Sequence, residues 1–318
     1  MARTPSITIV TAGDAGYFGL LTDLLTSLRR GLGERLYPLS ILDVGLSEAQ
    51  ADSLRRTYGA TVRDPGWDLN YPRRAHAREY LKAMTARPHL PKHFPGYDIY
   101  LWLDADCWVQ DASVLDIFIH GAAAGNLAIV PEIDRSYWTI HKRPKLWGQN
   151  QKAFAWAYGL SEGYHYGHNV ILNVGAFALR GDAPHWQLWS DNYARALHRT
   201  RLNPWAYKDK IECFLVDQTS LNRAVFVQNA PTTLLPAYCN WFCGKGTPMF
   251  DAEKHLVIEP YEPHQALGIV HLAGKGMKER VWTLKTLQGG TIATRLTYTG
   301  VQALPRATKN PFKIAARD

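Results

Sequence analysis

The first 60 residues alternate between short apolar runs and stretches with the spacing of an amphipathic helix. Residues 6–10 and 39–42 have the apolar, β-branched character of strands. A capping box at 47–50 predicts the start of a helix that continues to Tyr58. This strand–helix–strand–helix order predicts parallel strands joined by right-handed crossovers. The first of the two helices, ending near Gly31, is predicted by leucines that recur on one face: Leu21, Leu24, Leu25 and Leu28.

The rest of the chain continues this α/β pattern with one interruption. Residues 131–168 are rich in Trp, Tyr, His and Lys and have no clear periodicity, which predicts a large functional insertion. We find no internal repeat and no low-complexity linker, so we expect one continuous domain. Further strands are expected at 99–103, 127–130, 170–179 and 269–271, and helices at 70–85, 114–119 and 183–197.

The strongest chemical signal is the end of the apolar run 99–103, where Asp104 and Asp106 follow with one small residue between them. The run has the character of a strand buried on both faces, and ligands of open α/β sheets bind beyond the carboxyl ends of such strands. Two neighbouring carboxylates repel each other unless they share a positive charge. The pattern therefore predicts a Mn²⁺ or Mg²⁺ site, of the kind that neutralises the leaving diphosphate in a nucleotide-sugar enzyme.

Composition narrows the class of partner more than the class of fold. The net charge of +8 and the isoelectric point of about 9.2 favour acidic partners such as nucleotides or anionic membrane surfaces. The sequence has no dense Lys/Arg run, no zinc-finger spacing and no RNA-binding signature, so we expect no nucleic-acid partner. The 11 Trp and 16 Tyr suit a protein whose aromatic side chains line clefts as well as the core.

Cysteine usage and hydropathy bear on location. The four cysteines are too few and too irregularly spaced for a disulfide framework. We recognise no signal peptide and no membrane-spanning stretch, so a cytoplasmic location is expected. The mildly basic residues after 286 fit either a solvated tail or a weak peripheral contact with the inner face of a membrane. The oligomeric state is not indicated.

Three further motifs place polar side chains at strand or helix ends. Gly175, two residues after Asn173 in a predicted strand, indicates close approach of a ligand or of another backbone. Asp217 and Gln218 begin an apparent helix, where simple helix capping explains Asp217 equally well. His271 ends a predicted strand and would complete a metal site with the two aspartates, although a lone histidine more often has a structural role.

Taken in order, these motifs resemble the GT-A glycosyltransferases of family 8, which include glycogenin and the bacterial lipooligosaccharide galactosyltransferases. The resemblance implies a Rossmann-like GT-A catalytic domain over residues 1–285, with a mixed central sheet flanked by helices. It also implies that 131–168 is an acceptor-side insertion and 286–318 a basic C-terminal extension. The similarity spans about residues 6–280 and lies in the segments 11–17, 42–48, 103–106, 173–175, 217–222, 236–240 and 271–274, together with Arg78.

The resemblance further implies a retaining transferase that uses a UDP-sugar and Mn²⁺. Its metal ligands would be Asp104, Asp106 and His271. Asp217 would bind hydroxyl groups of the transferred sugar, and Gln218 would lie near its anomeric carbon. Donor-binding roles are implied for Thr11, Ala12, Asp14, Tyr17, Asp43, Arg78, Asp104, Ala105, Asn173, Gly175, Asn240, Gly274, Lys275 and Lys278.

Two segments depart from the family pattern. The first loop has the sequence Ala-Gly-Tyr at 15–17, where the family usually has Asn-Tyr. The closing motif has Met277 where the family has a lysine, with Lys275 and Lys278 on either side. Either lysine could therefore contact the diphosphate, and the identity of the donor sugar stays open.

Two other classes of function remain open at this point. A nucleotidyltransferase of related fold also uses strand-end carboxylates, but it normally carries a Gly-rich basic loop after the first strand, whereas 11–14 is acidic. A non-catalytic protein that binds sugar nucleotides or carbohydrates would use the same aromatic residues without turnover. Release of UDP from a UDP-sugar distinguishes the enzyme from such a binder. Acceptor contacts are expected in the insertion, with the candidates Trp138, His141, Trp147 and Tyr166.

Overall fold

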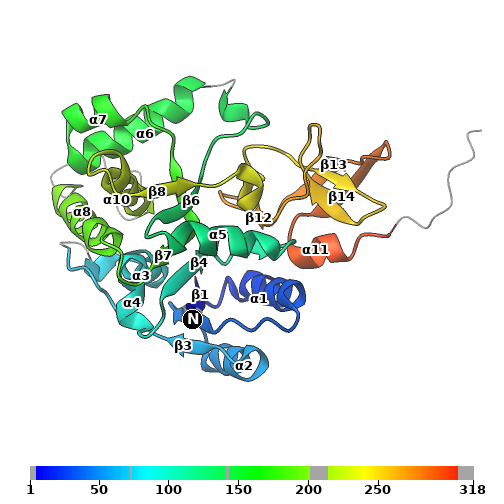
Figure 1. Cartoon of the computed structure of the whole chain (residues 1–318), viewed down its shortest axis with the longest axis horizontal. Coiled ribbons are helices and arrows are strands. Elements are labelled where there is room, and N and C mark those ends of the chain that lie inside the picture. The colour runs from blue at the N-terminus through cyan, green and yellow to red at the C-terminus, as the bar shows by residue number, and fades with distance from the viewer. Residues whose placement is uncertain (1–4, 72–73, 141–142, 201–213, 307–318) are drawn as a thin grey trace, which may run out of the picture.

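A seven-stranded sheet forms the centre of the computed structural model, which describes residues 5–71, 74–140, 143–200 and 214–306. Neighbouring strands are parallel except at β7, which runs antiparallel to both of its neighbours. The expected mixed α/β sheet is therefore confirmed. The strands lie in the order β3 (Thr61–Arg63), β2 (Leu39–Asp43), β1 (Ile7–Gly13), β4 (Ile99–Leu103), β7 (Leu172–Arg180), β6 (Leu127–Pro131) and β8 (Thr232–Leu234) (Figure 1).

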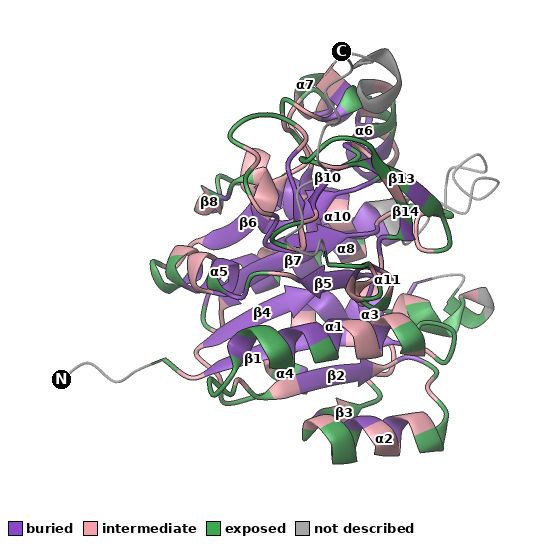
Figure 2. Ribbon diagram, turned by 90° about the vertical axis from the view of Figure 1, so that its right-hand side faces the viewer, coloured by how far each residue is buried: buried purple, intermediate pink, exposed green. Residues whose placement is uncertain are grey.

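Helices cover both faces of this sheet, and a hydrophobic core lies on each side of it (Figure 2). All five side chains of β4 are buried, as its sequence predicts. They alternate between the two cores, with Leu101 in one and Trp102 in the other. The central strand thereby holds the residues that follow it at a fixed place. The covering helices are α1 (Phe18–Leu32) and α5 (Ser113–Ala123) on one face, and α6 (Arg143–Tyr158), α8 (His185–Thr200) and α10 (Phe214–Phe226) on the other.

Local sequence signals set several of these elements. The predicted capping box begins α2 (Glu48–Tyr58): the Gln50 backbone N–H donates to Ser47 Oγ at 3.3 Å, and the Ser47 N–H donates to Gln50 Oε1 at 2.9 Å. In α8, the aromatic residues Trp186 and Trp189 are buried on the face that packs against β7. The start of α2 and the buried face of α8 are therefore as the sequence predicts.

One three-stranded sheet and two two-stranded sheets pack beside the main sheet and share a third hydrophobic core. The hairpin formed by β13 and β14 spans residue 285, where the sequence predicts the boundary between the catalytic domain and its extension. The helix α11 lies against α1 through a contact between Thr299 and Asp23. Among the described residues, none of the helices is long and apolar enough to cross a membrane. The elements are β5 (Cys107–Val109), β9 (Trp241–Phe242), β10 (Met249–Asp251), β11 (Leu256–Ile258), β12 (Ile269–His271), β13 (Val281–Lys285), β14 (Thr291–Arg295) and α11 (Tyr298–Gln302).

Two stretches differ from the helices and loops that the sequence predicts. The expected helix over 70–85 is wrong, because Arg78 has an extended backbone with φ −74° and ψ 144° that separates short helical turns. The insertion at 131–168, expected to be irregular, is largely helical, since it contains α6 and α7. Apolar and polar residues are mixed around α6, so no periodicity reveals it. The remaining short elements are η1 (Arg74–His76), η2 (Glu79–Leu81), α3 (Lys82–Ala86), η3 (Arg87–His89), α4 (Leu90–His93), η4 (Trp138–Ile140), α7 (Leu160–Tyr166) and η5 (Ala237–Cys239).

Candidate active site

Strand β4 of the main sheet and strand β12 of the three-stranded sheet end close to each other. The Asp104 backbone N–H donates to the Gly175 carbonyl of β7 at 2.7 Å. The Leu272 N–H, at the end of β12, donates to the Asp106 carbonyl at 3.0 Å. The segment 104–106 is therefore fixed between the two sheets. This arrangement brings Gly175 and His271 to Asp104 and Asp106, although both lie far from that pair in the sequence.

Asp106 is buried between an imidazole and an ammonium group. Its Oδ1 lies 3.3 Å from His271 Nε2, and its Oδ2 lies 2.9 Å from Lys278 Nζ. Burial alone would raise the pKa of Asp106, but the hydrogen bonds and positive charges of His271 and Lys278 outweigh burial and hold that pKa well below its usual range. Asp106 is therefore negatively charged, and the ammonium group of Lys278 pairs with that charge.

His271 is oriented by Asn240, which is fully buried. His271 Nδ1 lies 3.0 Å from Asn240 Oδ1. With Nδ1–H donating to that oxygen, Nε2 is the ring nitrogen that faces Asp106. An oxygen acceptor on one ring nitrogen commonly fixes the tautomer of a histidine that binds metal through the other.

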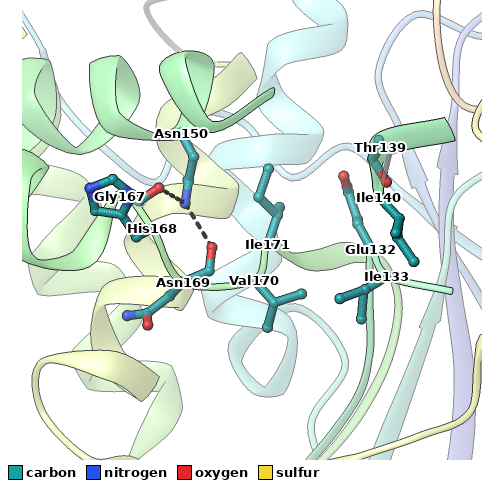
Figure 3. Close-up of a pocket in the computed structure, with 10 residues that line it drawn as sticks. All are labelled: Glu132, Ile133, Thr139, Ile140, Asn150, Gly167, His168, Asn169, Val170 and Ile171. Carbon is teal, nitrogen blue, oxygen red and sulfur yellow. Dashed lines mark hydrogen bonds between the residues drawn. The ribbon is translucent and has the colours of Figure 1, made fainter. Parts of the chain in front are cut away.

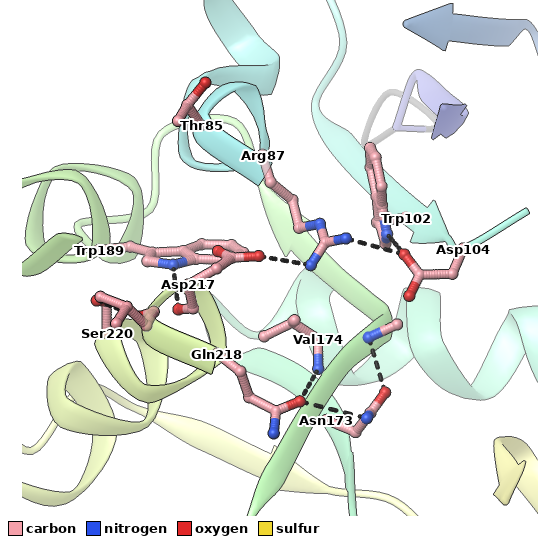
Figure 4. Close-up of polar contacts among 12 residues, drawn as sticks. Thr85, Arg87, Trp102, Asp104, Asn173, Val174, Trp189, Asp217, Gln218 and Ser220 are labelled. Atoms are coloured by element: carbon pink, nitrogen blue, oxygen red, sulfur yellow. Dashed lines mark hydrogen bonds and ion pairs between the residues drawn. The ribbon is translucent and has the colours of Figure 1, made fainter. Parts of the chain in front are cut away.

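A buried arginine that the sequence analysis missed joins two of the predicted aspartates (Figure 4). Arg87 Nη1 donates to Asp217 Oδ2 at 2.7 Å, and Nη2 donates to Asp104 Oδ1 at 3.0 Å. The guanidinium carbon lies 4.7 Å from the centroid of the Trp102 ring. Trp102 Nε1–H donates to the same Asp104 oxygen at 2.8 Å. Two donors thus fix Oδ1 of Asp104.

Asp217 lies within the first turn of α10, and its carboxylate contacts Arg87. Burial raises the pKa of Asp217 to about 7, against the opposing positive charge of Arg87. Asp217 Oδ1 and Arg87 Nε are buried and have no hydrogen-bond partner in the part of the chain that the structure describes. Such atoms need a partner, and a polar ligand would provide one.

Asn173 and Gln218 form a second polar group beside the Arg87–Asp217 pair (Figure 4). Asn173 Nδ2 donates to Gln218 Oε1 at 3.3 Å and to Glu132 Oε1 at 2.7 Å. The other oxygen of Glu132 forms an ion pair with Lys245, which is largely buried. This polar network therefore extends from the site toward the residues that follow β6.

Gly175 leaves open the space on which these groups converge. A β-carbon at this position would collide with His271 Cε1 and would lie 2.8 Å from Asn173 Oδ1 and from Asp104 Oδ2. The close approach that the sequence indicates for this glycine is therefore present. Asp104 presents Oδ2 to this space, while its Oδ1 is fixed by Arg87.

The chemistry of these donors fits a divalent cation. The compact group of potential ligand atoms, all within 4.8 Å of one another, comprises Asp106, Cys107 and His271, and does not include Asp104. Burial raises the pKa of the Cys107 thiol well above its ordinary value, so the thiol stays neutral and is a poor ligand. Within this group one carboxylate and one imidazole remain. Asp104 lies outside it but presents Oδ2 to the same space, and two carboxylates with one imidazole suit a divalent cation.

The loops after β1 and β2 border the site beside Lys278. Lys278 Nζ lies 5.1 Å from the centroid of the half-exposed Tyr17 ring. Asp14 Oδ1 accepts the Tyr17 backbone N–H at 2.9 Å. Asp43 uses Oδ1 to accept two backbone N–H groups of its own loop, at 3.0 and 2.8 Å. Ala105 and Thr11 are buried, Ala12 is half-buried, and the Thr11 hydroxyl has no hydrogen-bond partner among the described residues.

Other predicted residues lie apart from these contacts. Arg78 is exposed, and it is Arg87 that contacts the site carboxylates. Lys275 is exposed, beside Gly274 with its positive φ of 108°. Of the acceptor candidates, Trp138 donates Nε1–H to the Gly244 carbonyl at 3.0 Å, and Tyr166 packs half-buried on a hydrophobic core. His141 and the side chain of Trp147 lie outside the described residues.

Sequence reasoning missed Arg87, Trp102, Glu132 and Lys245. Trp102 reads as an ordinary apolar residue of a buried strand, but its indole N–H bonds to Asp104 and its ring packs against Arg87. Arg87 follows a predicted basic helix that ends at 85, and its two partners are 17 and 130 residues away in sequence. The signal that the sequence offered for Arg87 was its place next to Pro88, just after the expected helix.

Solved structures identify the fold. A galactosyltransferase, LgtC, solved with donor and acceptor sugar analogs, superposes with a TM-score of 0.50 at 18% identity, over 84% of this chain and 87% of that chain. A bifunctional glycosyltransferase, WbbM, gives a TM-score of 0.52 at 13% identity, over 86% of this chain but only 47% of its own length. No protein-family model and no curated protein sequence matches the chain. The chain therefore has the GT-A fold, as its motifs predict.

Proposed function

We propose that the chain is a metal-dependent, retaining glycosyltransferase that transfers a hexose from a UDP-sugar to a hydroxyl group of an acceptor. The observation that carries this proposal is the convergence of Asp104, Asp106 and His271 at one strand end, beside the buried Arg87–Asp217 pair. The GT-A fold, which LgtC and WbbM share, supports it. A non-catalytic binder would have no need of an oriented histidine beside a buried aspartate.

The metal-side residues would stabilise the leaving diphosphate. Asp104, Asp106 and His271 would hold Mn²⁺ or Mg²⁺, which supplies positive charge for the diphosphate as the sugar–phosphate bond breaks. Lys278 contacts both Asp106 and Tyr17, so we assign it, rather than Lys275, to the diphosphate. Burial opposes the charge of Lys278, but Asp106 outweighs burial and raises its pKa, so the ammonium stays charged.

The sugar-side residues would bind and orient the transferred hexose. Asp217 Oδ1, buried without a partner among the described residues, is an acceptor for sugar hydroxyl groups. Gln218 is held by Asn173 and by the Val174 backbone N–H, at 3.3 and 3.4 Å, and would lie near the anomeric carbon. The residues of the first two loops, with Tyr17 half-exposed among them, would contact the nucleoside.

The reaction needs no protein nucleophile. The bond from the anomeric carbon to the diphosphate oxygen breaks, and the acceptor oxygen bonds to that carbon on the same face. The acceptor proton passes to the departing diphosphate oxygen, whose charge the fixed cationic groups stabilise most as it develops. Trapping a glycosyl adduct on Asp217 or Gln218 would contradict this route.

A screen of nucleotide sugars tests the proposal. UDP-, GDP- and dTDP-sugars are compared by thermal shift and by nucleotide release, each with Mn²⁺ and with a chelator. We expect a UDP-sugar to stabilise the fold and to release UDP slowly by hydrolysis, both only with the metal. A protein that is stabilised without release of UDP is a binder, and a protein indifferent to chelation is not a metal-dependent transferase.

A further inference from the structure

A pocket of about 180 Å³ lies next to the polar network of the candidate active site (Figure 3). It is formed within the segment that leads from β6 to β7. Its walls come from the end of β6, from η4, from α6 and from the turn at 167–171. The site described above uses one residue of this pocket, Glu132.

The surface that lines the pocket is mainly apolar, and the amide of Asn150 within it is already hydrogen-bonded. Ile133, Ile140, Val170 and Ile171 line it, and none of its ten lining residues is Trp, Tyr or Phe. Asn150 donates Nδ2–H to the Gly167 and Asn169 carbonyls at 3.1 and 3.2 Å. Sugar rings bind through polar groups and aromatic faces, and a mainly apolar lining without Trp, Tyr or Phe suits them less. An aliphatic group fits it better.

The charge in the pocket is balanced as well. The Glu132 carboxylate lines the pocket, but one of its oxygens pairs with Lys245 and the other accepts from Asn173 at 2.7 Å. An ionic ligand would have to compete with this pair. The occupant is therefore uncharged.

The pocket adjoins the polar group of Asn173 and Gln218 through Glu132. Glu132 and Gln218 share the donor group Asn173 Nδ2. Ile171 precedes Asn173 by two residues, which places it about 7 Å further along the strand direction. An acceptor whose hydroxyl lies at Gln218 would thus direct the group on the far side of its sugar ring toward Ile171.

We propose that this pocket binds the aliphatic aglycone of the acceptor, so that the enzyme acts on glycosides of alkyl alcohols in preference to free or methyl glycosides. This inference rests on the proposed function, because it names the acceptor class of the same site. Apolar burial supplies the preference: two methylene groups transferred from water to the pocket correspond to a roughly 15-fold gain.

Methyl and hexyl β-glycosides of glucose and galactose, below the concentration at which they form micelles, test the inference. We measure kcat/KM for each as acceptor, and their binding to the protein without donor by titration calorimetry. Ile133 is half exposed, so Ile133→Asp places a charge in the pocket without disturbing the core, and Ile133→Ser is the milder variant. Leu160→Asp is the matched control, because Leu160 is 85% exposed and outside the pocket.

For at least one sugar, the hexyl glycoside should exceed the methyl glycoside by roughly 15-fold in kcat/KM and in affinity. This ratio should fall to about one in Ile133→Asp, fall partly in Ile133→Ser, and persist in Leu160→Asp. Equal values for the two glycosides, or a ratio that survives Ile133→Asp, would overturn the inference. Failure of the proposed function shows separately, as absence of metal-dependent UDP release, and the calorimetric ratio still decides whether the pocket binds the alkyl chain.

Discussion

Arg87→Met separates the electrostatic role of the buried arginine from its packing. Met retains an unbranched side chain over Trp102 but removes the charge and both hydrogen bonds. Asp217, with a side chain 1% exposed, is then buried without a counter-charge, whereas Asp104 is 29% exposed and can be hydrated. Removing one partner of a buried ion pair costs about 3–5 kcal/mol. At the lower figure, and at about 2–4 °C per kcal/mol, we expect the Tm to fall by about 6–12 °C.

The loss should grow with pH. The pKa of Asp217, about 7 in the folded protein, lies above its unfolded value of about 3.9. The bound proton therefore stabilises the folded state at low pH, and this stabilisation is lost as pH rises toward 7. Without Arg87 the pKa of Asp217 in the folded protein rises further. The variant therefore continues to lose stability as the pH rises above 7, whereas the contribution of Asp217 to the stability of the wild type no longer changes there. The Tm difference between them should be larger at about pH 8.5 than at about pH 6.

Thermal unfolding in the presence of a chelator measures both effects without interference from bound metal. The double variant Arg87→Met, Asp217→Asn is the control, because it removes the uncompensated carboxylate together with its partner. It should be more stable than Arg87→Met alone at about pH 8.5. If the double variant is no more stable, or if the Tm difference is the same at both pH values, the buried charge does not explain the loss.

Three further substitutions test the neighbouring contacts. Trp102→Phe keeps an aromatic ring but removes the indole N–H that donates to Asp104. This variant should bind Mn²⁺ about 10-fold more weakly in titration calorimetry. Gly175→Ala places a methyl group in the space between the metal-side ligands. It should reduce UDP release more than 100-fold, about the effect of a misplaced catalytic group. The control Gly19→Ala, whose added methyl group has no atom within 4 Å, should leave UDP release unchanged. Lys278→Met should lower kcat for UDP release more than Lys275→Met does; the reverse order would reassign the diphosphate lysine.

The fold and the place of Asp104 and Asp106 at the end of β4 could be predicted because their signals are local. The buried run of β4 and the two aspartates that end it are contiguous in sequence, and so is the capping box of α2. His271 ends an apolar strand in the same way. Asp104 and Asp106 follow β4 at the carboxyl edge of the main sheet, where ligands of open α/β sheets bind. His271 reaches them from β12 of a separate sheet, and no local signal gives that placement.

The rest of the site depends on contacts that no local pattern encodes. Arg87 is defined by the two carboxylates it meets, and both come from other elements of the fold. Glu132 and Lys245 each read as an ordinary surface charge until the fold buries them as a pair. The insertion could not be resolved into helices because apolar and polar residues are mixed around α6. The resemblance to family 8 therefore pointed to Asp217 and Gln218 but not to Arg87, which joins Asp217 to Asp104.

The most direct test of the central claim is Mn²⁺-dependent UDP release by Asp106→Asn, compared with wild type and with Asp182→Asn. Asp182 is the matched control, because it is exposed and pairs only with Arg180 among the described residues. We expect wild type and Asp182→Asn to bind Mn²⁺ and release UDP from a UDP-sugar, and Asp106→Asn to remain folded but lose both activities. Retained Mn²⁺-dependent release in Asp106→Asn would contradict the metal-centred site.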